Sequence, residues 1–331
     1  MFAVFLLLRL EYSRPLFITS YLITLFWFLL LYFRLQRTQR LLIAVVPFGR
    51  AASMVLIGHV IWQSLEKPEL PAGCSTVTAD FHYDLPREWE EFLADCALRG
   101  ISVLHYKQLR QSLTGQVEIE HLSENSYGSL IPNSPYLTLK AIGDFILAVA
   151  ALPVLVPLFA VTAVAIKLDS RGPVFFRQQR MGYRGQLFTV WKFRTMAHST
   201  RDAGDRDGAI TQSGDARVTR FGRFLRRSRI DELPQVINVL RGEMSWIGPR
   251  PEAEVLSRWY QSEIPFYRYR HIVRPGISGW AQVNQGHVAE LSEVWQKLNY
   301  DFFYISNFSF WLDVLIVFRT FKTALTGFGS R

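Results

Sequence analysis

The apolar positions of the chain gather into two long runs, with shorter alternating runs between and after them. The first long run, PLFITSYLITLFWFLLLYF at 15–33, has no charged residue and is long enough to cross a bilayer as a helix. Three arginines follow in RLQRTQR at 34–40, so the positive-inside rule places the chain after this helix in the cytoplasm. Residues 1–36 are therefore predicted to be an N-terminal membrane segment, in which the run at 2–10 is too short to span alone.

The second long apolar run, AIGDFILAVAALPVLVPLFAVTAVAI at 141–166, is also long enough to enter a membrane. A straight span is the simplest interpretation. Basic residues flank both ends, however, which favours the cytoplasmic side for each end. Pro153 and Pro157 lie mid-run, where proline removes a backbone hydrogen bond and bends a helix. These features favour a re-entrant helix, broken at the prolines, that dips into the membrane and returns.

Between these runs, residues 37–120 alternate between strand-like and helix-like patterns. This order is typical of a small parallel α/β layer, a truncated Rossmann-like domain. A second membrane helix over 41–62 is the alternative, but Arg50 and His59 are costly in lipid. Of the dinucleotide fingerprint G-x-G-x-x-G only Gly49 is present, so no dinucleotide is expected here. The pattern predicts strands at 41–46, 75–81 and 101–106 and helices at 50–65 and 86–100.

The remainder of the chain is predicted to form a second domain after a linker. Residues 121–136 are polar with two prolines and are predicted to be the linker, and 137–331 form the compact, mainly helical domain. Its last run, at 300–325, is aromatic and amphipathic, which suits a helix lying in the membrane interface or an ordinary core helix. The fold class predicted is thus an α/β membrane protein with a spanning helix, a Rossmann-like domain, a re-entrant helix and interfacial helices.

The net charge and its location along the chain limit the classes of ligand that the protein is expected to bind. The net charge is +9, and the segment from Arg171 to Arg229 holds 14 Lys and Arg against four Asp, which accounts for the whole excess. Such a segment suits anionic lipid headgroups or a polyanionic ligand such as a nucleoside diphosphate. No nucleic-acid-binding module is present, so no nucleic acid partner is expected. Cys74 and Cys96 have no metal or disulfide spacing and indicate free thiols in a reducing compartment.

Charged residues that could form an active site are most concentrated in RRSRIDELPQVINVLRGEMSWIGPRPE at 226–252, where Asp231 and Glu232 are adjacent. Pro234 favours the first turn of a helix, which we expect to begin near Leu233. The acid pair then lies at the N-terminal end of this helix, where free N–H groups attract anions. Acidic residues at a helix start are also common as simple stabilisers, so the pair alone does not identify a site.

The basic residues around the acid pair point to phosphate chemistry. Lys192 and Arg194 are two apart in the strand-like KFRTM and are expected on one face. Arg226 precedes the acid pair, and Arg250 is held in the Pro-flanked GPRPE. Guanidinium groups bind phosphate oxygens in pairs. A carboxylate beside a phosphoanhydride can attack phosphorus or hold a bridging Mg²⁺, and two adjacent acids can divide these tasks.

A rival metal motif has the form D-x-D at 205–207, as in many glycosyltransferases. It lies in a Gly- and Asp-rich stretch expected to be a loop. The histidines His198, His271 and His287 show no metal-ligand spacing.

Three long stretches together resemble the bacterial sugar transferase family, the monotopic polyprenyl-phosphate phosphoglycosyl transferases. The resemblance covers residues 138–325, over half of the chain, and the N-terminal part resembles a shortened long-form member. The stretches are IKLDSRGPVFFRQQRMGYRGQLFTVWKFRTM (166–196), ARVTRFGRFLRRSRIDELPQVINVLRGEMSWIGPRPE (216–252) and RPGISGWAQVN (274–284).

The resemblance implies a transferase that moves a sugar 1-phosphate from a UDP-sugar to undecaprenyl phosphate, with release of UMP. It implies that Asp231 attacks the sugar-bearing phosphate, that Glu232 holds Mg²⁺, and that Arg226 and Arg250 contact phosphate and nucleotide. The enzyme would catalyse the first membrane step of exopolysaccharide, capsule or O-antigen synthesis, on the cytoplasmic face of the bacterial inner membrane. The role of residues 41–120 stays open from the sequence, and a docking or homodimer surface is our hypothesis for it.

The chain departs from the family at the predicted helix break. Pro157 matches the helix-breaking proline, but Val156 stands where the family usually has serine. A serine hydroxyl can bond a carbonyl freed at the kink, so this break would have to be stabilised by Pro153 or by other contacts. Two other functions stay open from the sequence: a metal-dependent glycosyltransferase that uses the D-x-D motif and releases UDP, and a non-catalytic membrane adaptor.

Overall fold

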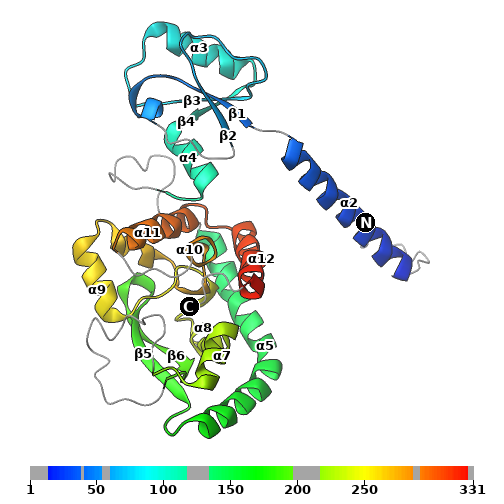
Figure 1. Cartoon of the computed structure of the whole chain (residues 1–331), viewed down its shortest axis with the longest axis vertical. Coiled ribbons are helices and arrows are strands. Elements are labelled where there is room, and N and C mark those ends of the chain that lie inside the picture. The colour runs from blue at the N-terminus through cyan, green and yellow to red at the C-terminus, as the bar shows by residue number, and fades with distance from the viewer. Residues whose placement is uncertain are drawn as a thin grey trace. The chain divides into compact units, whose positions relative to one another are not determined.

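The chain forms two compact units, Met1–Leu113 and Thr114–Arg331. Their elements are drawn in the computed structural model of Figure 1. The predicted domain limits after residues 36, 120 and 136 stay predictions. The structure describes residues 14–38, 41–53, 60–117, 134–196, 217–285 and 291–326.

The first helix, α2 (Arg14–Thr38), covers the predicted span at 15–33. Its large apolar side chains are exposed, among them Tyr21, Phe26 and Trp27. Exposed aromatic and aliphatic side chains along a helix are what a lipid environment accommodates. The crossing of a membrane by α2 stays a prediction.

The small α/β unit holds a four-stranded parallel sheet in the order β2-β1-β3-β4, which confirms the predicted parallel layer. Its core is formed by small and branched residues of the strands, such as Ala44 and Val77, packed against Trp89, Leu93 and Cys96 of α3. The elements are β1 (Leu41–Val45), the 3₁₀ helix η1 (Gly49–Ser53), β2 (Val60–Ser64), β3 (Thr76–Ala79), α3 (Arg87–Leu98), β4 (Ser102–His105) and α4 (Tyr106–Thr114).

The helix predicted at 50–65 is wrong where the structure describes it. Its start is the short η1 and its end is strand β2, while residues 54–59 lie outside the described part. The alternative of a membrane helix at 41–62 is wrong as well, because β1 and β2 pair in parallel from Leu41↔Val60 to Val45↔Ser64. A short apolar run has no decisive period, and pairing with β1 decides its form.

The second unit begins with a helix that is longer than predicted. Helix α5 (Ser134–Asp169) includes the last residues assigned to the linker at 121–136, and residues 118–133 lie outside the described part. Pro135 is compatible with this start, because the first helical turn needs no N–H from that position. Within the described part of the chain, α5 is the one helix long and apolar enough to cross a membrane.

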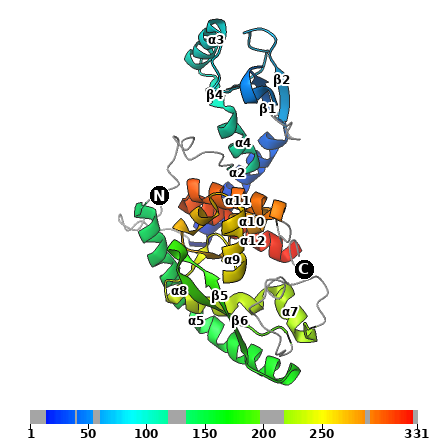
Figure 2. The same cartoon turned by 90° about the vertical axis from the view of Figure 1, so that its left-hand side faces the viewer.

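Pro153 and Pro157 lie inside α5, which continues through both of them as a single helix. Figures 1 and 2 show that the helix axis changes direction along its length. The predicted break is therefore a bend, since the loss of two N–H donors is absorbed without ending the helix. The re-entrant path through the membrane stays a prediction.

The rest of this unit places a hairpin and short helices beside α5. Strands β5 (Phe175–Met181) and β6 (Leu187–Phe193) are antiparallel around the turn η3 (Tyr183–Gly185), and β7 (Ser245–Ile247) pairs in parallel with β8 (Gly276–Ser278). The helices are α7 (Arg220–Ser228), η4 (Ile230–Gln235), α8 (Val236–Leu240), α9 (Glu254–Glu263), η5 (Tyr267–Ile272), α10 (Trp280–Asn284), α11 (Leu291–Ser306) and α12 (Phe310–Thr326).

The C-terminal run at 300–325 is divided between two helices, α11 and α12, and is not one continuous helix. Leu312 and Ile316 of α12 are buried in the largest core cluster of the unit. On its other side α12 exposes Trp311 and Phe318, each by more than two thirds of its surface. One face of α12 is thus core, and the other suits the interfacial role proposed from sequence.

Candidate active site

The acid pair lies on a sharp reversal between two helices. Arg229 ends α7 with a left-handed backbone (φ +56°), and η4 begins at the next residue, three positions earlier than the helix start expected near Leu233. The amide of Glu232 donates to the Arg229 carbonyl, which fixes the first turn. This positive φ in a non-glycine residue is strained, which shows that the surrounding packing holds the turn in place.

Glu232 is almost fully buried, with 6% of its surface exposed, and is surrounded by cations. Lys192 of β6 donates to its Oε1 at 2.9 Å. Arg250, in the segment after β7, donates to both carboxylate oxygens, with Nη1 3.2 Å from Oε2. Burial alone would raise the pKa of Glu232, but the charges and hydrogen bonds of Arg250 and Lys192 outweigh it and hold the pKa well below its usual range.

Asp231 has a different environment although it is the preceding residue. None of the described residues donates a hydrogen bond to its carboxylate. Burial and the charge of Glu232 raise its pKa to about 6, against the opposing charges of Lys192, Arg250 and Arg226. The site therefore pairs a fixed, ionised carboxylate with a free carboxylate of raised basicity.

The predicted basic residues divide between two places. Lys192 contacts the acid pair, and burial lowers its pKa to about 8. Arg226 donates through Nε to Thr195 Oγ1 at 2.9 Å and acts on Asp231 through its charge. Arg194 instead donates to the carbonyl and hydroxyl oxygens of Ser170, at 2.6 and 2.9 Å, at the end of α5. There its charge suits a helix C-terminus, and its role toward phosphate stays a prediction.

Sequence reasoning missed Arg180 of β5. It donates to the carbonyl of Pro251, and burial together with the charge of Arg250 lowers its pKa to about 10. Arg180 lies in the stretch VFFRQQRMG at 174–182, where polar residues are expected to face solvent. Arg270 was missed too: it donates to the Arg250 carbonyl at 2.8 Å and pairs with Asp301. These contacts, besides the flanking prolines, hold Arg250 in place.

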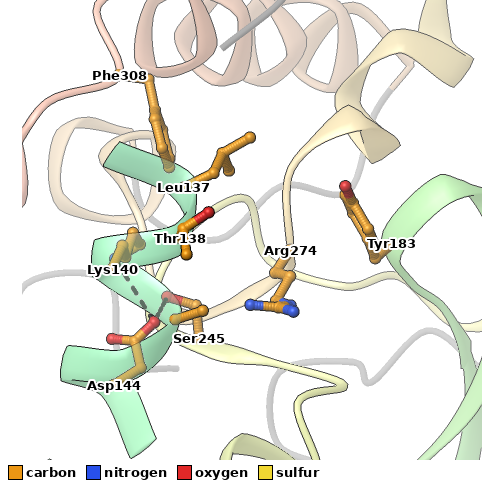
Figure 3. A pocket seen from close by; sticks show the side chains of 9 residues that line it. Leu137, Thr138, Lys140, Asp144, Tyr183, Ser245, Arg274 and Phe308 are labelled. Carbon is orange, nitrogen blue, oxygen red and sulfur yellow. Dashed lines mark hydrogen bonds and ion pairs between the residues drawn. The ribbon is translucent and has the colours of Figure 1, made fainter. Parts of the chain in front are cut away.

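A cavity of about 370 Å³ lies elsewhere in the same unit, and neither Asp231 nor Glu232 lines it. Figure 3 shows Arg274 and Tyr183 facing the first turns of α5 across this cavity. Lys140 and Ser245 are paired with Asp144 on the α5 side. The cavity therefore joins α5 to the segment before β8. Its lining is Leu137, Thr138, Lys140, Ala141, Asp144, Tyr183, Ser245, Arg274 and Phe308.

The acid pair offers the donor type that Mg²⁺ requires. Mg²⁺ takes oxygen ligands and is usually held by one or two carboxylates together with substrate phosphates. Glu232 is kept ionised and fixed in orientation, as a metal ligand must be. Lys192, which contacts Glu232 Oε1, has a lowered pKa and a flexible side chain that can yield its place to a cation. The residues present thus fit a Mg²⁺ ion at Glu232.

The other candidate ligands from sequence do not join this site. The D-x-D motif at 205–207 and the residues His198 and His287 lie outside the described part of the chain. His271 is buried, and burial and the charge of Arg270 lower its pKa to about 3. Within the described residues, the group with metal-ligand spacing is Asp80, His82 and His105 of the α/β unit.

The comparison with known families agrees with this geometry. The family model of the bacterial sugar transferases matches residues 135–327, which include the acid pair and the cations around it. The chain belongs to the bacterial sugar transferase family. It is therefore a transferase.

The relatives of this sugar transferase have specific names. A UDP-N-acetylgalactosamine-undecaprenyl-phosphate N-acetylgalactosaminephosphotransferase of Aeromonas hydrophila is 48% identical over 326 residues, 98% of this chain and 76% of its own length. UDP-glucose:undecaprenyl-phosphate glucose-1-phosphate transferases of Xanthomonas campestris pv. campestris and Escherichia coli (strain K12) are 45% and 44% identical over 62% and 55% of this chain. The chain spans only 42% and 39% of the length of these two.

Proposed function

We propose that this sugar transferase moves a sugar 1-phosphate from a UDP-sugar to undecaprenyl phosphate through a phosphorylated Asp231. In the first step an Asp231 oxygen bonds to the sugar-bearing phosphorus, the phosphoanhydride P–O bond breaks, and UMP leaves. In the second step an oxygen of undecaprenyl phosphate bonds to the same phosphorus and the acyl phosphate P–O bond breaks. The carboxylate is restored and the product is an undecaprenyl diphosphate sugar.

The observation that carries this proposal is the free carboxylate of Asp231 with its pKa raised to about 6. A carboxylate of ordinary pKa is a weak nucleophile, and one of pKa near 6 is more nucleophilic yet still mostly ionised at pH 7. Asp231 is also free to move, because no described residue holds its oxygens by hydrogen bonds. Glu232 lacks both properties and suits a holding role.

The cations around the pair would stabilise the charge that develops on the phosphates. Arg250 and Lys192 already lie against Glu232, and Arg226 acts on Asp231. A negatively charged nucleophile can approach a diphosphate only if that charge is offset. Mg²⁺, held by Glu232, would supply further Lewis-acid stabilisation of the phosphate oxygens when bound.

The membrane location follows from the acceptor and the helices. Undecaprenyl phosphate is a lipid, and α5 is long and apolar enough to enter the bilayer. The exposed aromatic face of α12 suits the bilayer interface. We propose the cytoplasmic face of the bacterial inner membrane, where soluble UDP-sugars and the lipid acceptor meet.

The donor sugar is proposed from the relative that matches both units. The Aeromonas hydrophila protein, which aligns with 98% of this chain, is named for N-acetylgalactosamine. The UDP-glucose enzymes align with only 62% and 55% of the chain. UDP-N-acetylgalactosamine is therefore the proposed donor and UDP-glucose the matched comparison.

The test is nucleotide release by the detergent-purified full chain with Mg²⁺ and undecaprenyl phosphate. We expect UMP with one donor, loss of UMP release by at least about a thousandfold in Asp231→Asn, and unchanged release in the exposed control Asp84→Asn. Intact-protein mass spectrometry without acceptor should show one sugar phosphate added to the wild type and none to Asp231→Asn. Release of UDP, or UMP release that survives Asp231→Asn, would refute the assignment.

A further inference from the structure

A second group of chemical interest lies at the edge of the small parallel sheet. Asp80 directly follows β3, and His105 is the last residue of the neighbouring strand β4. His82 follows two residues after Asp80. The carboxyl ends of neighbouring parallel strands meet at one edge, so residues 23 or more apart in sequence come together there. In α/β sheets this edge is where ligands bind, beside the point where the strand order reverses.

The three side chains have the spacing of ligands to a single ion. His82 Nδ1 and His105 Nε2 are 3.1 Å apart. Asp80 Oδ1 lies 3.5 Å from His105 Nε2 and 3.8 Å from His82 Nδ1. Tetrahedral zinc, with bonds of about 2.0–2.2 Å to nitrogen and oxygen, separates its ligand atoms by about 3.3–3.6 Å. The observed triangle is close to one face of such a tetrahedron.

The Asp80 carboxylate is oriented by backbone amides, as expected for a preformed metal site. Asp80 Oδ2 accepts from the Arg50 amide at 2.9 Å, and Oδ1 accepts from the His82 amide at 3.1 Å. Burial opposes ionisation, but these two hydrogen bonds together with the charges of His105 and His82 outweigh it and lower the pKa of Asp80. Gly49 permits the approach: its φ is +60°, and a Cβ there would lie 2.7 Å from Asp80 Oδ2.

We propose that Asp80, His82 and His105 bind a divalent transition-metal ion of the zinc class. Two imidazole nitrogens and one carboxylate oxygen are a ligand set that zinc and its neighbours prefer, whereas Mg²⁺ prefers oxygen alone. His82 is exposed, which gives the ion a path of entry, while Asp80 and His105 are buried. Three protein ligands leave a fourth position open to water or to a small ligand. The site is independent of the proposed transfer reaction.

Metal binding at His105 should change a hydrogen bond at the start of helix α4. In the structure the Lys107 amide donates to His105 Nδ1 at 3.2 Å, so the neutral ring carries its proton on Nε2. A metal at Nε2 replaces that proton, and the neutral ring then carries a proton on Nδ1. The Lys107 contact at the first turn of α4 (Tyr106–Thr114) is lost, and the long 3.2 Å bond is a small loss beside metal binding.

The test is Zn²⁺ binding by the tag-free full chain, stripped with a chelator and titrated against a chromophoric chelator. His82→Ala is the key variant, because an exposed side chain can be removed without unfolding the unit. We expect its Zn²⁺ affinity to be at least about tenfold lower than that of the wild type. Asp84→Asn, which removes an exposed carboxylate of the same segment, should bind as the wild type does. Equal affinity of His82→Ala and wild type would overturn the proposal.

Two further readouts exclude binding elsewhere, at the thiols or the acid pair. Co²⁺ in place of Zn²⁺ should give visible absorption bands that His82→Ala weakens or shifts. Hydrogen exchange of the Lys107 amide should become faster with Zn²⁺ in the wild type and stay unchanged in His82→Ala. Slower exchange on loading would contradict the proton arrangement that the site requires. Because none of these measurements uses nucleotide release, they stand or fall separately from the transferase activity.

Discussion

The acid-pair turn and the edge of the small sheet both centre on carboxylates, but their partners differ in kind. Glu232 and Asp231 are surrounded by Lys192, Arg226 and Arg250, whose charges are fixed at neutral pH or nearly so. Asp80 faces two imidazoles instead. Permanent cations attract phosphates and compete with a metal ion for the carboxylate oxygens, whereas neutral imidazoles add their own lone pairs to a metal. The partner residues, more than the carboxylates, select the class of ligand.

The two adjacent carboxylates of the acid-pair turn also differ in the residues that surround them. Asp231 and Glu232 are adjacent, yet the pKa of Asp231 is raised and that of Glu232 is lowered. Glu232 receives the hydrogen bonds of both Lys192 and Arg250, so its charge is stabilised. Asp231 receives burial and the charge of its neighbour instead. Removing the charge of Glu232 should therefore lower the free energy of unfolding, and removing the charge of Asp231 should raise it.

The largest effect is expected from Glu232→Gln. It leaves Lys192 and Arg250 charged and only partly exposed, without their buried carboxylate. Loss of one partner from a buried ion pair typically lowers the free energy of unfolding by about 3–5 kcal/mol. Denaturant unfolding in detergent measures this, with the exposed Glu263→Gln as the matched control. A change below about 1 kcal/mol would mean that the cations find other partners, and the distinction from Asp231 would fail.

Asp231→Asn should instead stabilise the protein, by about 1–2 kcal/mol at pH 7.5. The folded state raises the pKa of Asp231 from 3.8 to about 6, so it binds that proton more tightly than the unfolded state does. The wild type therefore loses stability as pH rises from about 4 to about 6, and the asparagine variant does not. Parallel unfolding curves at pH 4 and pH 7.5 check this. A variant less stable than wild type at pH 7.5 would contradict the raised pKa.

The sequence located the acid pair, and the family resemblance implied separate roles for its two members, but the physical difference between the two carboxylates did not follow from the residues themselves. The density of arginines around residue 231 marked the place, because so many charges rarely serve packing alone. The pKa of each carboxylate depends on Lys192 and Arg250, which lie 40 and 18 residues from Glu232. The difference between their pKa values cannot be predicted without knowing which of the two acids these distant cations reach.

The fold shows the same limit. The strand-like stretch at 75–81 and the amphipathic helix at 86–100 were confirmed as β3 and α3. The helix predicted at 50–65 was wrong because pairing with β1 decides the form of a short apolar run. The group of Asp80, His82 and His105 went unnoticed because His105 is 23 residues from His82. The available signal was that Asp80 and His105 both end predicted neighbouring strands.

A pH profile sharpens the contrast within the turn. The rate of UMP release should decrease as the pH is lowered through about 6, because Asp231 must be ionised to attack. The slope of this decrease should correspond to the binding of one proton. Lys192→Met removes a charge that lowers the pKa of Asp231, so the limb should move up by about one pH unit. The profile of kcat/KM for both proteins measures this. An acid limb that does not move in the variant would place the titrating group elsewhere than Asp231.

The smallest effect is expected from Asp80→Asn, the counterpart of Glu232→Gln in the α/β unit. Asp80 accepts two amide hydrogen bonds and has a lowered pKa, so its contribution to stability is present at neutral pH and is lost as pH falls through its folded-state pKa. Among the described residues, the ionisable partners of Asp80 are His82 and His105, so the change leaves no Lys or Arg without its carboxylate. An asparagine oxygen can still accept one of the two amide hydrogen bonds. We expect a loss of about 1 kcal/mol in the free energy of unfolding at pH 7 and UMP release within about twofold of wild type. A loss as large as that of Glu232→Gln would show that both carboxylates contribute equally to the free energy of unfolding. The Lys and Arg partners of Glu232 would then not explain a difference between the two sites.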